Sequence, residues 1–179
     1  MIRFLAPAVI FILLAGFLFV GLYKDPSLVP SPLIGKPIPT FAATMLRDAN
    51  KTVTDKDLQG QVALINVWAT WCPACKEEHG TLVQLAEQVG IPIYGLNYKD
   101  DREAAIQWLQ DYGDPYVLNV FDESGRIGID FGVYGAPETF LVDEHGVIQH
   151  KLVGIMTPQV WQTTFVPKIN QLSNTVAQQ

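Results

Sequence analysis

The sequence predicts an α/β fold in which a central mixed β-sheet is flanked by helices, preceded by an N-terminal transmembrane helix. Three observations support this prediction. A run of 20 uncharged residues, Phe4 to Tyr23, follows Arg3 near the N-terminus. Strand-like and helix-like patterns alternate along most of the remaining chain. Both cysteines lie in one Cys-Pro-Ala-Cys motif, Cys72 to Cys75, where a strand pattern gives way to a helix pattern.

Residues 1–23 are expected to form an uncleaved signal anchor. The 20 uncharged residues match the thickness of the hydrocarbon core of a bilayer and exceed the apolar region of a typical signal peptide. A long cleavable signal is the alternative, but no small-residue cleavage site is evident after Ala15-Gly16. Arg3 lies on the short side, whereas Lys24 is followed at once by Asp25, so the positive-inside rule favours a cytoplasmic N-terminus.

A proline-rich tether is predicted over residues 24–36, which leaves residues 37–176 as the folded domain. Pro26, Pro30 and Pro32 oppose helix formation and favour extended chain. About 140 residues remain, enough for one conventional core. The net charge of −6 argues against a nucleic-acid-binding protein, which requires a basic face.

The elements around the cysteine motif are the clearest in the chain. Residues 62–68 form an apolar run typical of a buried strand, and residues 69–71 are a tight connection. A helix is predicted over residues 76–89, with apolar positions at helical spacing: Leu82, Leu85, Ala86 and Val89.

Strand and helix patterns continue beyond this helix. A short strand is expected over residues 91–97. The next helix ends at Tyr112, and its start at Asp100-Asp-Arg-Glu103 resembles a capping box. Residues 117–121 are a further short strand, and residues 122–125 are a turn.

The chain closes with a predicted hairpin and a final helix. The hairpin joins strands over residues 138–143 and 147–153, and the helix starts with Thr157 as N-cap and Pro158 at the first helical position. This order of elements predicts a mixed sheet with the cysteine motif at the carboxyl end of a strand, where open α/β sheets place their active sites.

The position of Cys72 at a helix N-terminus favours redox chemistry. Unpaired backbone N–H groups and the helix dipole stabilise a thiolate there, and Cys75 lies close enough to resolve a mixed disulfide. A structural disulfide closing two intervening residues would constrain little of the unfolded chain. A zinc site needs four ligands, and haem attachment needs histidine directly after the second cysteine, where Lys76 stands instead.

Several stretches resemble the DsbE/CcmG thiol:disulfide interchange proteins of cytochrome c maturation. The segment from Val67 to Cys75 is similar to the thioredoxin-family active site, and further similarity lies at residues 33–36, 78–79, 95–101 and 132–139. With the N-terminal anchor, the resemblance implies a reductant with a thioredoxin-like domain, attached by a single span to the bacterial inner membrane and facing the periplasm. The implied partners are apocytochrome c or a maturation thiol protein, and a membrane electron donor of the DsbD or CcdA kind. A redox-active Cys72–Cys75 disulfide is implied, without any cofactor or metal.

The resemblance also assigns roles around the motif. Ala136-Pro137 matches the segment with the family's cis-proline, which presents backbone to the substrate chain. Glu78 and Glu138 match the acidic residues of this branch, and they are candidates for proton transfer to Cys75 because Asn66 replaces the buried aspartate of thioredoxins. Without the resemblance, Glu78 would simply complement a helix dipole and Glu138 would be a solvated residue at a strand end.

Three more residues near the motif are candidate substrate contacts. Trp71 and Tyr134 are aromatic residues that can pack against a peptide, although core packing is an equally common use of such side chains. Pro73, inside the motif, completes this set, and His79 is expected to be an ordinary helix residue.

Two other functions remain open at this point. A disulfide oxidase or isomerase would use the same cysteines, but carboxylates at Glu78 and Glu138 would oppose a thiolate and so favour a reductant. The other alternative is a non-catalytic module that binds haem or a peptide on the same fold.

Overall fold

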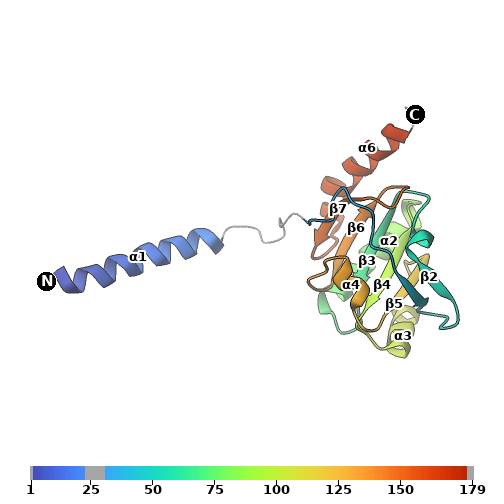
Figure 1. Cartoon of the computed structure of the whole chain (residues 1–179), viewed down its shortest axis with the longest axis horizontal. Helices are drawn as coiled ribbons and strands as arrows, with labels where there is room; N and C mark the ends of the chain where they lie inside the picture. Colours follow the sequence, from blue (N-terminus) through green and yellow to red (C-terminus); the bar gives the residue numbers. More distant parts are fainter. Residues whose placement is uncertain (1, 23–30, 177–179) are drawn as a thin grey trace. The chain divides into compact units, whose positions relative to one another are not determined.

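The computed structural model describes residues 2–22 and 31–176 of the chain. The chain divides into two units, residues 1–30 and residues 31–179, and each is described by itself (Figure 1).

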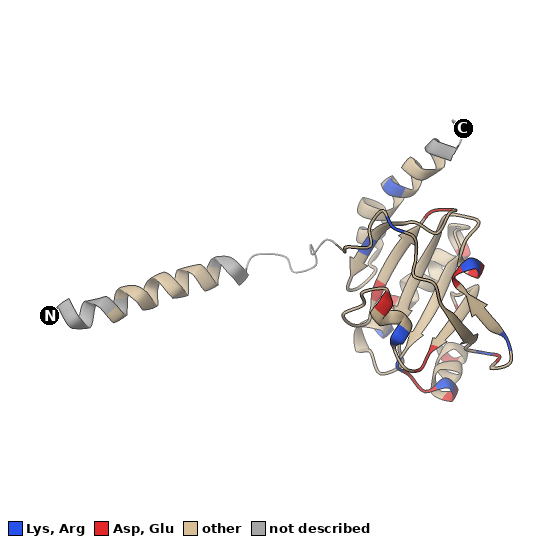
Figure 2. Cartoon of the chain, viewed as in Figure 1, with Lys and Arg blue, Asp and Glu red and all other residues tan. Residues whose placement is uncertain are grey.

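The described part of the first unit is a single helix, α1 (Ile2–Leu22). The side chains placed within it are uncharged, as Figure 2 shows. Over the residues that are described, none of the helices combines the length and the apolar character needed to cross a membrane. Tyr23, the last residue of the predicted anchor, and residues 24–30 of the predicted tether lie outside the described residues.

The second unit is built on a mixed sheet, whose described strands follow the order β2-β1-β5-β4-β3-β6-β7 (Figure 1). Strands β3, β4 and β5 run parallel, while the pairs β1–β2, β1–β5, β3–β6 and β6–β7 are antiparallel. The strand bounds are Ala42–Met45 (β1), Thr52–Thr54 (β2), Ala63–Trp68 (β3), Ile93–Tyr98 (β4), Leu118–Asp122 (β5), Glu138–Val142 (β6) and Ile148–Val153 (β7).

Helices cover both faces of this sheet. Buried side chains of α2, α3 and the C-terminal helical region share one core cluster with Leu64 and Trp68 of β3. Side chains of α4, η2 and the segment before β1 share the other cluster with Ile65 and Val67 of the same strand. The helix bounds are Asp55–Leu58 (η2), Pro73–Gln88 (α2), Arg102–Tyr112 (α3), Arg126–Asp130 (α4), Pro158–Val160 (α5), Trp161–Phe165 (η3, a π-helical stretch) and Val166–Val176 (α6).

The predicted mixed sheet with helices on both faces is confirmed, but short elements were not predicted. Strands β1 and β2 have only four and three residues, and α4 has only five, so their patterns are too short for a period to be recognised. The structure also places residues 31–36 in the folded unit rather than in the tether. The Gly35 N–H donates to the Ile148 carbonyl at 2.8 Å, and the Ile148 N–H donates to the Lys36 carbonyl at 2.9 Å.

The cap of α3 differs from the predicted one by a residue. The carboxylate of Asp101, not that of Asp100, accepts the N–H of Ala104 at 2.8 Å and so caps the helix. Asp100 is instead committed to the loop that precedes Cys72, through two hydrogen bonds from Thr70. A tertiary contact thus takes the side chain that the local pattern assigned to the cap.

The sheet brings two separate loops to one of its ends. Strand β3 leads into Cys72, and β6 runs antiparallel to it with Glu138 opposite Val67. The residues just before β6 therefore lie at the same end of the sheet as the cysteine motif. We call residues 132–137 the cis-proline loop, because the Ala136–Pro137 peptide bond is cis.

Candidate active site

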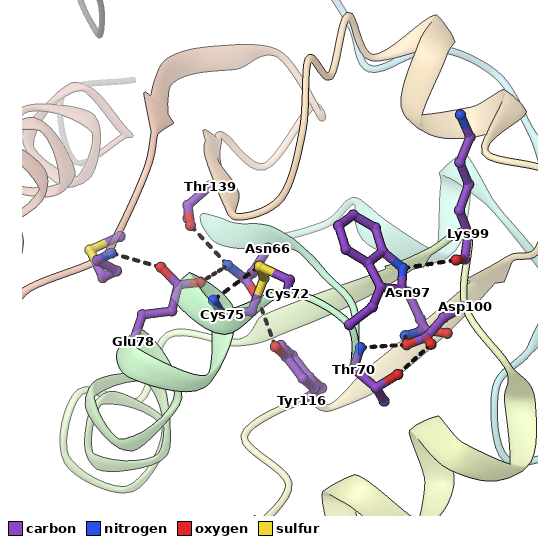
Figure 3. Close-up of a disulfide and its surroundings, with 12 residues drawn as sticks. Asn66, Thr70, Cys72, Cys75, Glu78, Asn97, Lys99, Asp100, Tyr116 and Thr139 are labelled. Atoms are coloured by element: carbon purple, nitrogen blue, oxygen red, sulfur yellow. Dashed lines mark hydrogen bonds between the residues drawn. A yellow bond between two sulfur atoms is a disulfide. The ribbon is translucent and has the colours of Figure 1, made fainter.

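The two cysteines form a disulfide at the N-terminus of α2 (Figure 3). Cys72 is the N-cap of the helix, and its sulfur accepts the backbone N–H of Cys75 at 3.0 Å. Pro73 occupies the first turn, where its missing N–H costs no intrahelical hydrogen bond. When the disulfide is reduced, the same N–H and the helix dipole can stabilise a thiolate on Cys72.

Both sulfur-bearing residues are buried in this oxidised state. Cys72 is 3% exposed and Cys75 is 2% exposed, and they belong to the same core cluster. Exposure alone therefore does not distinguish the attacking cysteine, but position does: Cys72 ends the loop, whereas Cys75 lies one turn inside the helix.

The loop before Cys72 is attached to the end of β4 by Asp100. Its carboxylate accepts the N–H of Thr70 at 2.7 Å, the hydroxyl of Thr70 at 2.5 Å and the side-chain amide of Asn97 at 2.9 Å (Figure 3). The backbone N–H of Asp101 donates to it as well, at 3.0 Å. We call this set of hydrogen bonds the Asp100 clasp.

The indole of Trp71 lies beside the same clasp. Its N–H donates to the carbonyl of Lys99 at 2.9 Å, and the side chain is nevertheless 53% exposed. Lys99 has a positive φ of 49°, which is unusual for a residue other than glycine. The two loops thus fix an exposed aromatic surface directly before Cys72.

Beneath the disulfide lies a buried polar network centred on Asn66 (Figure 3). The amide of Asn66 donates to Glu78 at 2.8 Å and to the hydroxyl of Thr139 at 3.0 Å, and its oxygen accepts the hydroxyl of Tyr116 at 2.8 Å. The second oxygen of Glu78 accepts the N–H of Met156 at 2.7 Å. Each bond aligns a donor with an acceptor, which offsets the cost of burying polar groups.

Glu78 is the titratable group of this network. Its side chain follows Cys75 by one helical turn, on the same buried face, and the residue is 1% exposed. Burial raises its pKa from 4.5 to about 7, although the hydrogen bonds from Met156 and Asn66 pull in the opposite direction. A carboxyl group with such a pKa can exchange protons near neutral pH, which a solvated helix-terminal glutamate cannot do as readily.

Glu138 lies on the other face of the sheet. It pairs across the ladder with Val67, whereas its neighbour Thr139 pairs with Asn66 and points into the network of Glu78. Successive side chains of a strand alternate between faces, so the structure does not bring the two acids together. Glu138 is buried, and its carboxylate is 2.9 Å from the ammonium of Lys151.

The remaining predicted contacts line the disulfide end of the sheet. Ala136 packs against the cluster that contains both cysteines, and Pro137 is buried. Tyr134 in the same loop is 71% exposed, and Pro73 at the start of α2 is also exposed. Trp71, Pro73 and Tyr134 therefore provide exposed apolar surface around the disulfide, whereas Ala136 and Pro137 are less accessible.

His79 is a packed residue of α2. The His79 ring is buried, contacts the carbonyl of Gly113 at 2.9 Å, and packs edge-on against Trp108. Burial lowers its pKa. Within the described part of the chain, no group of three or more His, Cys, Asp or Glu side chains could hold a metal ion.

Several residues of this site are not recognisable from the sequence patterns. Asp100 fits a helix cap and Thr70 fits a tight connection, while no local pattern around Tyr116 predicts a role for it. Lys151 likewise belongs to no motif. One signal was available for Lys151: in the predicted hairpin it lies diagonally across from Glu138, and opposite charges at such positions attract each other.

The fold and the paired cysteines define a thiol–disulfide oxidoreductase. The redoxin family model matches residues 33–165. Thiol:disulfide interchange protein DsbE from Pseudomonas aeruginosa is 51% identical over 94% of this chain and 93% of its own, and the Escherichia coli protein of the same name is 44% identical over 97% of both. The chain therefore belongs to the DsbE thiol:disulfide interchange proteins of the redoxin family.

Solved structures show the same fold. A secreted thiol-disulfide isomerase from Corynebacterium glutamicum superposes with a TM-score of 0.65 at 21% identity, covering 74% of this chain and 85% of its own. A thio-disulfide isomerase from Thermus thermophilus superposes with a TM-score of 0.62 at 25% identity, covering 75% and 96%.

Proposed function

We propose that the protein is a periplasmic reductant of cytochrome c biogenesis, which reduces the haem-binding cysteines of apocytochrome c or a thiol protein that serves them. The observation that supports this most is the placement of Cys72 as the N-cap of α2, with the proton-exchanging carboxyl of Glu78 beneath Cys75. The resemblance of the motif regions to cytochrome c maturation proteins supplies the substrate class.

The proposed reaction begins from the reduced protein. The thiolate of Cys72 attacks one sulfur of the client disulfide, and the other client sulfur leaves as a thiolate. Cys75 then transfers its proton to the Glu78 carboxylate and attacks the sulfur of Cys72, which releases the second client thiolate. Two electrons have passed to the client, and the protein retains the Cys72–Cys75 disulfide seen here.

The environment of the thiols supports the proposed direction of electron transfer. A strong oxidant stabilises its reduced, thiolate form. A carboxyl group at Glu78 that ionises near neutral pH would oppose further negative charge in the same buried region, which favours donation of electrons. A membrane thiol donor of the DsbD or CcdA kind would then restore the dithiol.

We also propose that residues 1–23 anchor the protein in the inner membrane with a single span. The 20 uncharged residues from Phe4 to Tyr23 support this proposal. Fractionation of cells expressing the full chain should leave it in the membrane, with the cysteine domain open to protease from the periplasmic side. Recovery of a soluble protein that starts beyond residue 20 would identify a cleaved signal instead.

The function is tested with an oxidised synthetic peptide that contains a Cys-x-x-Cys-His motif. The reduced full-length protein should reduce this peptide stoichiometrically, and a Cys72→Ser variant should lose the activity. A Ser124→Ala variant, changed at an exposed turn, is the matched control and should react as the wild type does. Retained peptide reduction in Cys72→Ser would exclude this mechanism. A wild-type protein that binds the peptide without reducing it would favour a non-catalytic binding module.

A further inference from the structure

We propose that Lys151 is a positioning residue, which together with Glu138 holds the cis-proline loop against the disulfide for exchange with a protein client. This inference deepens the proposed function and rests on it. It also gives Glu138 a role different from proton transfer to a cysteine.

The ammonium of Lys151 joins the two ends of the loop. It donates to the carbonyl of Gly132 at 2.7 Å and lies 2.9 Å from the carboxylate of Glu138, the residue directly after the loop. The residue is only 8% exposed, so these contacts are shielded from water. Removing one partner of such a pair leaves a buried charge uncompensated, which makes the pair sensitive to substitution.

The middle of the loop is held by the same two side chains. The other oxygen of Glu138 accepts the N–H of Tyr134 at 2.9 Å. The ammonium of Lys151 also lies 4.6 Å from the centre of the Tyr134 ring, within the range of a cation–π contact. One buried ion pair therefore fixes both the backbone and the exposed ring of Tyr134.

The loop lies where a client chain must approach. Ala136 packs against the cluster that contains Cys72 and Cys75, and Tyr134 is 71% exposed at the same end of the sheet. A client whose sulfur reaches Cys72 would meet this loop, whereas a small disulfide can reach the sulfur without it. The ion pair is on the opposite face of the sheet from Glu78, so its effect on exchange is expected to come from geometry.

The test compares two oxidants of the reduced full-length protein: the oxidised Cys-x-x-Cys-His peptide and hydroxyethyl disulfide. In Lys151→Met, the ratio of the peptide rate to the hydroxyethyl disulfide rate should fall on the order of tenfold, because a displaced loop misplaces the client. Lys56→Met, which removes an exposed ammonium outside this loop and its ion pair, should keep the wild-type ratio. An unchanged ratio in Lys151→Met would overturn the proposal.

A double variant separates positioning from the cost of an unpaired buried charge. Lys151→Met with Glu138→Gln leaves no unpaired charge, and the ratio should stay low because the loop still lacks the ammonium. Recovery of the wild-type ratio in the double variant would show that the single variant failed only through its buried carboxylate. That result would contradict a positioning role for Lys151.

Amide hydrogen exchange gives a readout that does not depend on the client. The N–H groups of Val133 and Tyr134 should exchange at least about tenfold faster in Lys151→Met than in the wild type, while those of β3 stay protected. Unchanged amide hydrogen exchange in the cis-proline loop would contradict the positioning role of Lys151 but would leave the proposed function intact. A wild-type protein that fails to reduce the peptide instead overturns the proposed function, and with it the claim about the ratio of rates.

Discussion

At the scale of single residues, Glu78 shows how burial changes the chemistry of a common side chain. A glutamate in the second turn of a helix ordinarily faces water, yet here its two oxygens accept hydrogen bonds from Asn66 of β3 and from the backbone of Met156. The hydroxyl of Tyr116 in turn donates to the oxygen of Asn66. Sequence alone could place Glu78 near Cys75 by helical spacing. It could not supply the two hydrogen-bond partners of Glu78, because only the tertiary fold brings β3 and the segment after β7 to this side chain.

The pKa of Glu78 predicts a specific pH dependence of stability. The folded-state pKa, about 7, is above the ordinary value of 4.5, so between these values the folded protein holds a proton that the unfolded chain has lost. Stability from this group is complete below 4.5 and is lost as the pH rises toward 7. A shift of this size corresponds to about 3 kcal/mol.

Urea unfolding of the oxidised protein at several pH values measures this effect. As the pH rises from 4.5 to about 7, the wild type should lose about 3 kcal/mol of unfolding free energy relative to Glu78→Gln, which lacks the titrating carboxyl. Glu77 is the exposed neighbour of Glu78, and the control variant Glu77→Gln should show the same pH dependence of the free energy of unfolding as the wild type. Parallel curves for Glu78→Gln and the wild type would show that the Glu78 pKa is not raised.

The two cysteines are predicted to have different roles. Because Cys72 ends the loop and Cys75 lies inside α2, Cys75→Ala should accumulate a mixed disulfide between Cys72 and the client peptide. Limiting alkylation of the reduced wild type, followed by mass spectrometry, should label Cys72 first. Trapping of the peptide by Cys72→Ala, but not by Cys75→Ala, would reverse these roles.

At the scale of elements, the active end of the sheet consists of strand ends and loops that hold one another. The strand β3, the helix α2 and the hairpin could be predicted, because their apolar patterns and turn residues are strong. The Asp100 clasp could not, since Asp100 also fits a helix cap and only the tertiary fold decides between the two uses. The contacts of Glu138 could not be predicted either, because its position at the start of a strand does not show which face of the sheet its side chain occupies.

The clasp predicts a stability effect at Asp100. Asp100→Asn replaces one acceptor oxygen by an amide group that faces N–H and O–H donors, so it should destabilise the protein by about 1–3 kcal/mol. Asp111→Asn is the control, because the Asp111 carboxylate accepts one exposed side-chain hydrogen bond from Gln107. It should change the free energy of unfolding by less than about 0.5 kcal/mol. Equal losses of unfolding free energy in Asp100→Asn and Asp111→Asn, measured by urea denaturation, would contradict a stabilising role of the Asp100 clasp.

At the scale of the whole molecule, one sheet assembles the redox centre from segments distant in sequence. The cysteine motif follows β3, the Asp100 clasp follows β4, and the cis-proline loop precedes β6. Parallel β3 and β4 and antiparallel β6 bring these three segments to one end. This arrangement explains why recognition of the cysteine motif sufficed to locate the site, although most of its supporting side chains were not predicted.

Whether this site donates electrons is decided by the reduction potential of the full-length protein. Equilibration with glutathione redox buffers, followed by quantification of Cys72–Cys75 oxidation, gives the value. A reductant should have a potential more negative than about −200 mV, toward the value of about −270 mV found for thioredoxin. A potential near −120 mV, typical of a strong oxidant, would contradict the account.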